Sequence, residues 1–239
     1  MRAHTKLEIQ HAVVVKSDDI AKIWKSMSGY GMKTKAVATC TDGMVRHFES
    51  CEALLCYENP LRAAFVSVEF SAQSSSFHDR AEVSIGQKYS SFVALSLHGE
   101  ESNISELRRN LADVVDGMKP WYSWAATVSL FNFFFPLLFV CSTLFFLTST
   151  FKINFVENSP GMPLSRAMLT VVVAVAMTGA VAGFFSAIQF LRTRYFPKIS
   201  FAIGQGLVRH QTSESIRWVV VVGFVVSVVA SIVVSVMFA

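Results

Sequence analysis

Three long apolar runs in the second half of the chain constrain its fold more than any other feature. They cover about 124–147, 167–191 and 218–238, and none contains Asp, Glu, Lys, Arg or His. A helix needs roughly 20 mostly apolar residues to cross the hydrocarbon core of a bilayer. The polar half of the chain is too small to cover three such segments as buried core helices. The runs therefore predict an all-α membrane domain, 121–239, with three transmembrane helices.

The charged residues between the runs predict a topology. Residues 121–239 contain seven Lys and Arg against two Asp and Glu, whereas residues 1–120 contain 14 against 15. Five of the seven basic residues lie between the second and third runs: Arg192, Arg194, Lys198, Arg209 and Arg217. Because positive charge is retained on the cytoplasmic side, we expect a multi-pass protein of the cell membrane, with its N-terminus in the cytoplasm and its C-terminus outside. Basic residues placed in this way favour the lipid bilayer, and not nucleic acid, as a partner.

The same basic segment has more than one interpretation. Its charges alternate with apolar residues, which is typical of a segment that binds anionic lipid headgroups or contacts the cytoplasmic domain as a coupling element. It can equally be a connector whose charges only set the topology.

Small residues recur at every fourth position in two of the runs. The third run contains Gly223, Ser227, Ser231 and Ser235, and the second contains Gly179, Gly183 and Ala187. Helices in lipid are held together by close backbone approach, which small residues permit. We expect the two stripes to pack on each other within one chain. Two alternatives are that they join copies into a homo-oligomer or that the serines line a pore.

Residues 1–120 predict a cytoplasmic α+β domain. Apolar residues alternate with polar ones near 7–15, 66–70, 81–85 and 93–97, which indicates strands. A hairpin is expected over 33–48, and helical spacing near 17–28, 51–57 and 103–118 indicates three helices. The expected fold is an antiparallel sheet with helices on one face, enclosing a single modest core.

No motif for catalysis or for cofactor binding is evident. The spacing of Cys40, His47, Cys51 and Cys56 matches no zinc pattern, and the glycines of "GYG" and "GQG" lack the rest of a nucleotide-binding fingerprint. We therefore expect no metal, no cofactor and no enzymatic activity.

Two functions fit these observations. The first is an integral membrane protein in which a cytoplasmic module on a three-helix anchor binds an unidentified ligand or protein, as a sensor would. The alternative is an oligomeric pore-forming or membrane-disrupting effector that the cytoplasmic domain gates.

Overall fold

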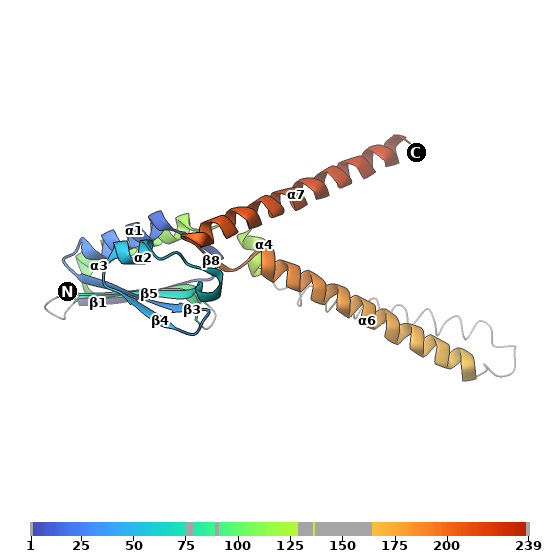
Figure 1. Ribbon diagram of the computed structural model, residues 1–239, viewed down its shortest axis with the longest axis horizontal. Coiled ribbons are helices and arrows are strands. Elements are labelled where there is room, and N and C mark those ends of the chain that lie inside the picture. Colours follow the sequence, from blue (N-terminus) through green and yellow to red (C-terminus); the bar gives the residue numbers. More distant parts are fainter. Residues whose placement is uncertain (1, 75–78, 89–90, 129–135, 137–163, 238–239) are drawn as a thin grey trace. The chain divides into compact units, whose positions relative to one another are not determined.

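The structure forms two compact units. The computed structural model describes residues 2–74, 79–88, 91–128, 136 and 164–237 (Figure 1). One unit combines Met1–Thr127 with Tyr195–Ala239, and the other is Val128–Arg194. The C-terminal segment therefore belongs to the same unit as the N-terminal domain.

A six-stranded antiparallel sheet is the centre of the N-terminal domain, as far as the described residues go. Its strands are β1 (Arg2–Ile9), β3 (Lys33–Cys40), β4 (Val45–Phe48), β5 (Phe65–Gln73), β6 (Arg80–Lys88) and β7 (Ser91–Glu100). They lie in the order β1-β7-β6-β5-β3-β4. Buried and exposed side chains alternate along β3 and β5, so one face of the sheet is apolar and the other is polar.

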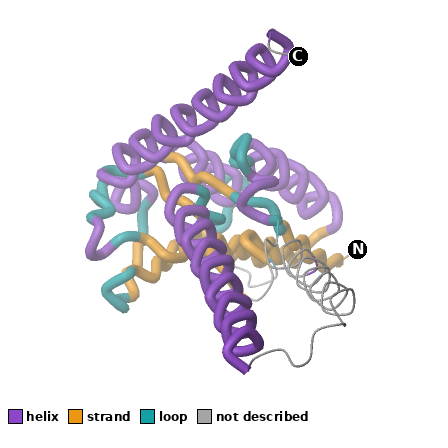
Figure 2. Tube along the Cα trace, turned by 90° about the vertical axis from the view of Figure 1, so that its right-hand side faces the viewer, coloured by secondary structure: helices purple, strands orange, loops and turns teal. Residues whose placement is uncertain are grey.

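Helices cover the apolar face. They are α1 (Ser17–Ser28), α2 (Cys51–Leu55) and α3 (Glu101–Gly117), with a short 3-10 turn, η1 (Leu61–Ala63), after α2. Figures 1 and 2 show them on one side of the strands. Ile20 and Ile23 of α1 and Leu111 of α3 are fully buried with Val83 of β6 in one core. The predicted antiparallel sheet with helices on one face is present.

A second, two-stranded sheet joins segments that are far apart in the sequence. β2 (Val13–Lys16) pairs in parallel with β8 (Ile199–Ala202), and Val13 lies opposite Ile199. Residues 10–12 interrupt the strand that was predicted over 7–15, so that its second half pairs away from the large sheet. The basic segment 192–217 is therefore not a loop, because its middle part is a strand of the first unit.

The remaining helices are α4 (Ser123–Thr127), α6 (Leu164–Tyr195) and α7 (Gln205–Met237). Within the described part of the chain, one helical segment, Gln205–Ser231, is long and apolar enough to cross a membrane, with a mean hydropathy of 1.7. The prediction of three transmembrane helices is therefore wrong, since the structure supports one candidate.

The physical reason is that the apolar composition of a run does not determine what covers it. The first run, 124–147, begins in α4, where Ala126 is buried against the N-terminal domain. Most of the rest of that run lies outside the described residues. The second run, 167–191, lies in α6. In the first half of α6 the structure describes the helix but not the surroundings of most side chains.

Ile203, which directly follows β8, tests whether the predicted linker belongs to the folded domain. Ile203 is fully buried in the main core, 83 positions beyond the predicted domain end at residue 120. We expect Ile203→Ala to lower the free energy of unfolding by about 2–5 kcal/mol, because it leaves a cavity. Urea unfolding in detergent micelles, followed by tryptophan fluorescence, measures this change.

The matched control is Ile216→Ala, which removes the same atoms from a side chain that is 36% exposed. It should change the stability by less than about 1 kcal/mol. Equal effects of the two substitutions would contradict the burial of Ile203 in the domain core.

Candidate functional site

The candidate site is the place where the N-terminal domain holds the start of α7. We call it the junction and define it as Glu58, Asn59, Trp121, Tyr122 and residues 195–218. Pro197 lies two residues after the end of α6, and the residue before a proline, here Phe196, is disfavoured in helical conformation. The chain then forms β8, turns at Gly204 and enters α7 at Gln205.

Two glycines allow this turn to contact the domain backbone directly. Gly204 has a φ of +51°, and a Cβ atom there would come within 2.5 Å of the carbonyl oxygen of Glu58. A Cβ atom on Gly206 would overlap the carbonyl oxygen of Phe201 and the amide nitrogen of Asn59. The backbone N–H of Gln205 donates to the Glu58 carbonyl over 2.7 Å. Only residues without a side chain fit this close approach.

Asn59 connects the two sides of the junction through three hydrogen bonds. Its amide oxygen accepts from the backbone N–H of Phe65 (2.8 Å), and its amide nitrogen donates to the carbonyl of Phe201 (3.1 Å). Its own carbonyl accepts from Nη2 of Arg209 (2.7 Å). Asn59 is 1% exposed and has a φ of 49°, a conformation that asparagine tolerates better than most residues.

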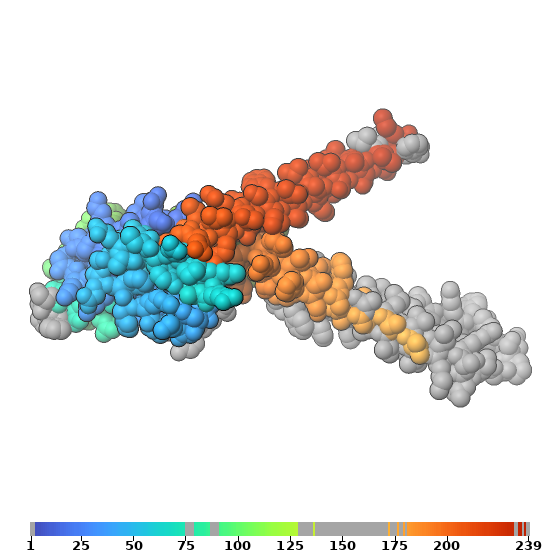
Figure 3. Space-filling view, viewed as in Figure 1, coloured from blue at the N-terminus to red at the C-terminus, as the bar shows by residue number. Residues whose placement is uncertain are grey.

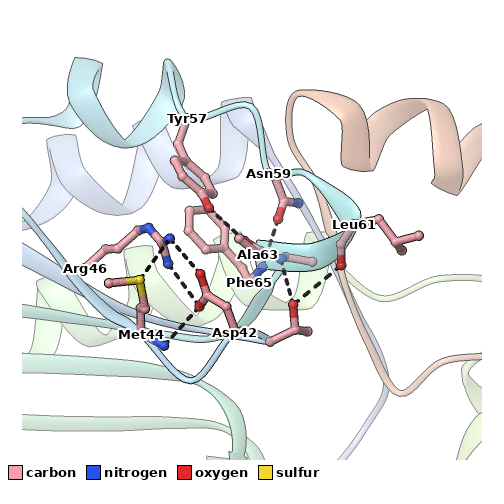
Figure 4. A network of polar contacts seen from close by, with 10 residues as sticks. Asp42, Met44, Arg46, Tyr57, Asn59, Leu61, Ala63 and Phe65 are labelled. Atoms are coloured by element: carbon pink, nitrogen blue, oxygen red, sulfur yellow. Dashed lines mark hydrogen bonds and ion pairs between the residues drawn. The ribbon is translucent and has the colours of Figure 1, made fainter.

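Neighbouring contacts hold the Asn59 loop in place (Figure 4). The Tyr57 hydroxyl donates to the Ala63 carbonyl (2.7 Å), and its ring stacks on Phe65 at 4.8 Å. The Phe65 ring in turn meets Phe201 of β8 edge to face at 5.8 Å. Contacts of Tyr57 and Phe65, on either side of Asn59, thus hold the loop in the conformation that contacts α7.

The first three turns of α7 present one face to the domain. Four residues along this face are buried or half-buried: Gly206, Arg209, His210 and Arg217. Beyond Arg217 the described side chains of α7 are exposed apart from the half-buried Val221. Figure 3 shows this part of the helix extending beyond the domain surface.

Arg217 is buried at the end of the docked stretch. Its side chain is 1% exposed, its Nε donates to the Tyr195 carbonyl, and its guanidinium lies 4.1 Å from the centroid of the Tyr122 ring. The Phe196 ring meets Tyr122 edge to face at 5.7 Å. A guanidinium over an aromatic face is attracted by the ring quadrupole, and more strongly so when both are removed from water.

Four buried polar atoms at the junction have no hydrogen-bond partner among the described residues. They are the hydroxyl of Tyr122, Nη1 of Arg209, Nδ1 of His210 and Nη1 of Arg217. The pKa of Tyr122 lies above its ordinary value, because burial raises it more than the positive charge of Arg217 lowers it. The phenol therefore stays neutral at physiological pH, and the junction is held by a cation on neutral aromatic rings. Next to it, the rings of Trp121 and Trp218 lie 5.4 Å apart, at the point where α7 leaves the domain.

The five predicted basic residues have different positions. Arg209 and Arg217 both lie on the docked face of α7 and bind the domain. Lys198 is exposed at the start of β8, with its ammonium 5.3 Å from the Phe92 ring centroid. Arg192 and Arg194 occupy the last turn of α6, which belongs to the other unit. Whether any of them binds lipid headgroups stays a prediction.

The predicted small-residue stripes lie on exposed helix faces. A Cβ atom on Gly179, Gly183 or Gly223 would meet no atom within 4 Å, and Ala187 and Ser235 are exposed. The hydroxyls of Ser227 and Ser231 donate to the carbonyls of Gly223 and Ser227, each over 2.8 Å. These serines are therefore satisfied within their own helix. The stripes belong to α6 and α7 of different units, and their packing stays a prediction.

The described residues offer no group of three His, Cys, Asp or Glu side chains that could hold a metal ion. Cys40 is buried, Cys51 is half-buried, and Cys56 is exposed; all three are free thiols. Burial raises the pKa of Cys51, which makes it a poorer nucleophile.

Sequence reasoning missed Asn59, Tyr122, Gly204 and Gly206 as functional positions. One signal was available, because Ile199, Phe201 and Ile203 alternate with smaller residues and thus have the spacing of a strand. Two glycines directly after such a strand indicate a close backbone contact.

Gly206→Ala tests the close contact at the junction. The added methyl group forces the Phe201 carbonyl and Asn59 apart, so we expect a loss of about 1–3 kcal/mol in unfolding free energy. Gly223→Ala on the same helix is the control; its methyl group enters open space, and alanine favours the helix. Urea unfolding in micelles compares the two, and a Gly206→Ala protein as stable as Gly223→Ala would rule out the contact.

Asn59→Ala tests the hydrogen bonds. It leaves the Phe65 N–H and the Phe201 carbonyl without partners, and we expect a loss of about 2–5 kcal/mol. Asn103→Ala replaces an exposed asparagine of α3 and should change the stability by less than about 0.5 kcal/mol. The midpoint of thermal unfolding, measured by circular dichroism, distinguishes these outcomes. A neutral Asn59→Ala would show that other contacts hold the junction.

Comparisons with known protein families, with curated proteins and with solved structures found no match to this chain. Its function must therefore be inferred from its own residues.

Proposed function

We propose that the protein is a non-enzymatic, membrane-anchored binding protein. Its N-terminal α+β domain is the binding module, and the apolar part of α7 anchors that module in a bilayer. The junction joins the two without a flexible linker.

One observation carries the proposal: α7 is a single continuous helix with two different halves. Its first three turns are docked on the domain, and the following residues, 218–237, contain no charged side chain and are apolar apart from Ser227, Ser231 and Ser235. Only 6% of its most apolar window is buried. A helix that is apolar on all sides is expected to be covered by protein or by lipid, and this one has little protein around it within its unit.

The length of the exposed half supports the same proposal. Residues 218–237 would extend about 30 Å as a helix, which matches the hydrocarbon thickness of a bilayer. Trp121 and Trp218 lie at its start, and tryptophan is enriched where a helix enters the membrane interface. These observations support a span that begins at the junction.

The charges support an orientation with the N-terminal domain in the cytoplasm. Residues 218–239 contain no Lys or Arg, whereas residues 192–217 before the proposed span contain five, of which Lys198 is exposed in the same unit as α7. Positive charge is retained on the cytoplasmic side. The C-terminus would then lie across the membrane.

The absence of a linker has a functional consequence. The domain contacts α7 through Asn59, Arg209 and Arg217, so a tilt of the domain requires a tilt of the helix or the loss of buried hydrogen bonds. Ligand binding by the domain would therefore be felt within the bilayer.

An epitope tag appended after Ala239 tests the anchor and its orientation. We expect the tag to bind antibody on intact cells. In the double variant Val225→Arg and Val229→Arg the tag should become accessible only after permeabilisation, because each arginine costs about 2.5–3.5 kcal/mol at the centre of a membrane helix. Both valines are exposed in the structure.

The control is the double variant Leu207→Arg and Val208→Arg. It adds the same charges to exposed positions in the docked half of α7, where no membrane is proposed, and the tag should stay accessible on intact cells. A wild-type tag that is reached only after permeabilisation would contradict the proposed orientation. A tag that stays outside despite arginines at 225 and 229 would contradict the span.

A further inference from the structure

The polar face of the large sheet contains a groove of about 560 Å³. It lies at one end of β3, β5 and β6, and its lining includes Lys33, Lys35, Ser71, Gln73 and Arg80. We propose that this groove binds a small soluble molecule carrying a phosphate or polyphosphate group. The inference supplies a ligand class for the binding module proposed above, and in that sense it rests on the proposed function.

The strand register brings the basic residues together. Lys33 of β3 lies opposite Gln73 of β5, which lies opposite Arg80 of β6, while Lys35 lies opposite Ser71. Residues two apart on a strand point to the same face. Three basic groups and two neutral polar groups thus converge on one exposed area, although the first and the last of them, Lys33 and Arg80, are 47 positions apart in the sequence.

The charge balance of the groove favours an anion. Its lining contains two lysines, an arginine and no carboxylate. Glu82 pairs with Arg80, and Glu49 is 4.0 Å from Lys35. Within the described part of the chain, Lys33 makes no ion pair. Its ammonium, together with the hydroxyl and amide donors beside it, is suited to phosphate oxygens, which accept charge-assisted hydrogen bonds.

The size and form of the groove favour a small molecule. Its volume is within the usual range for a ligand site, about 300–1,000 Å³. The groove is a local hollow. Its two lysines lie two positions apart along β3, and its arginine lies at the start of β6, two strands away in the sheet. A macromolecular surface would need a wider basic area.

The position of the groove separates it from the proposed membrane. It lies at the Lys33 end of β3, whereas Cys40, at the other end, is paired with Phe65 next to the junction. Seven residues of strand span roughly 23 Å. A soluble phosphate compound therefore fits better than a lipid headgroup of the bilayer that α7 would enter.

The test is a calorimetric titration of the full chain in detergent micelles with inorganic pyrophosphate, in about 0.15 M salt to screen unspecific attraction. We expect saturable binding with one site per chain. The double variant Lys33→Gln and Arg80→Gln should weaken it at least about tenfold, since each substitution removes a charge-assisted bond. Both side chains are exposed, so the thermal midpoint without ligand should stay unchanged.

The matched control is Lys22→Gln with Arg108→Gln. It removes one lysine and one arginine from exposed positions of α1 and α3, which cover the opposite face of the sheet. Its affinity should stay within about twofold of that of the unmodified protein. An equal loss in both variants would overturn the site, and so would the lack of saturable binding at pyrophosphate concentrations on the order of 10 mM.

A second arm uses nanodiscs to identify the source of the phosphate. Pyrophosphate should bind equally in zwitterionic discs and in discs with anionic phospholipid. Loss of binding only in the anionic discs would assign the groove to headgroups and overturn the soluble ligand. The titration in micelles does not depend on whether α7 crosses a membrane, so its failure is distinguishable from failure of the tag experiment.

Discussion

The close backbone approach of the Glu58–Asn59 turn to the turn at Gly204 is the contact on which the rest of the junction depends. It brings Asn59 within reach of Phe201 and Arg209, and it sets the direction in which α7 starts. The parallel pair β2–β8 would be marginal by itself. It persists because Val13, Val15 and Ile203 are buried in the same core as the large sheet.

Arg217 illustrates how a charge that precedes a long apolar helical segment can belong to the fold. A buried guanidinium loses its hydration, and this cost is offset only by partners of good geometry. Here a carbonyl and two aromatic rings take the place of water. The residue therefore stabilises one orientation of α7 on the domain. A lysine, with a compact and strongly hydrated charge, would not fill the same role.

The sequence predicted what depends on local patterns. Alternation along β5, β6 and β7 and the helical spacing of α1 and α3 gave the antiparallel sheet and its helices. The predicted number of transmembrane helices was wrong. Hydropathy does not distinguish the start of the first run from a segment covered by lipid, whereas Ala126 packs on Val14 and Tyr122 in a small protein core. The pairing of residue 13 with residue 199 could not be predicted, because periodicity contains no information on which distant strands meet. Asn59 and Arg217 acquire their roles only through that pairing.

The separation of β2 from β8 also sets an order of events during biosynthesis. Val13 leaves the ribosome 186 residues before its partner Ile199. At about 5–20 residues per second, the interval is roughly 10–40 seconds. During this time three consecutive valines, all buried in the finished protein, have an unpaired edge of the kind that templates aggregation. The parallel pair β2–β8 is thus among the last contacts of this unit that the growing chain can form.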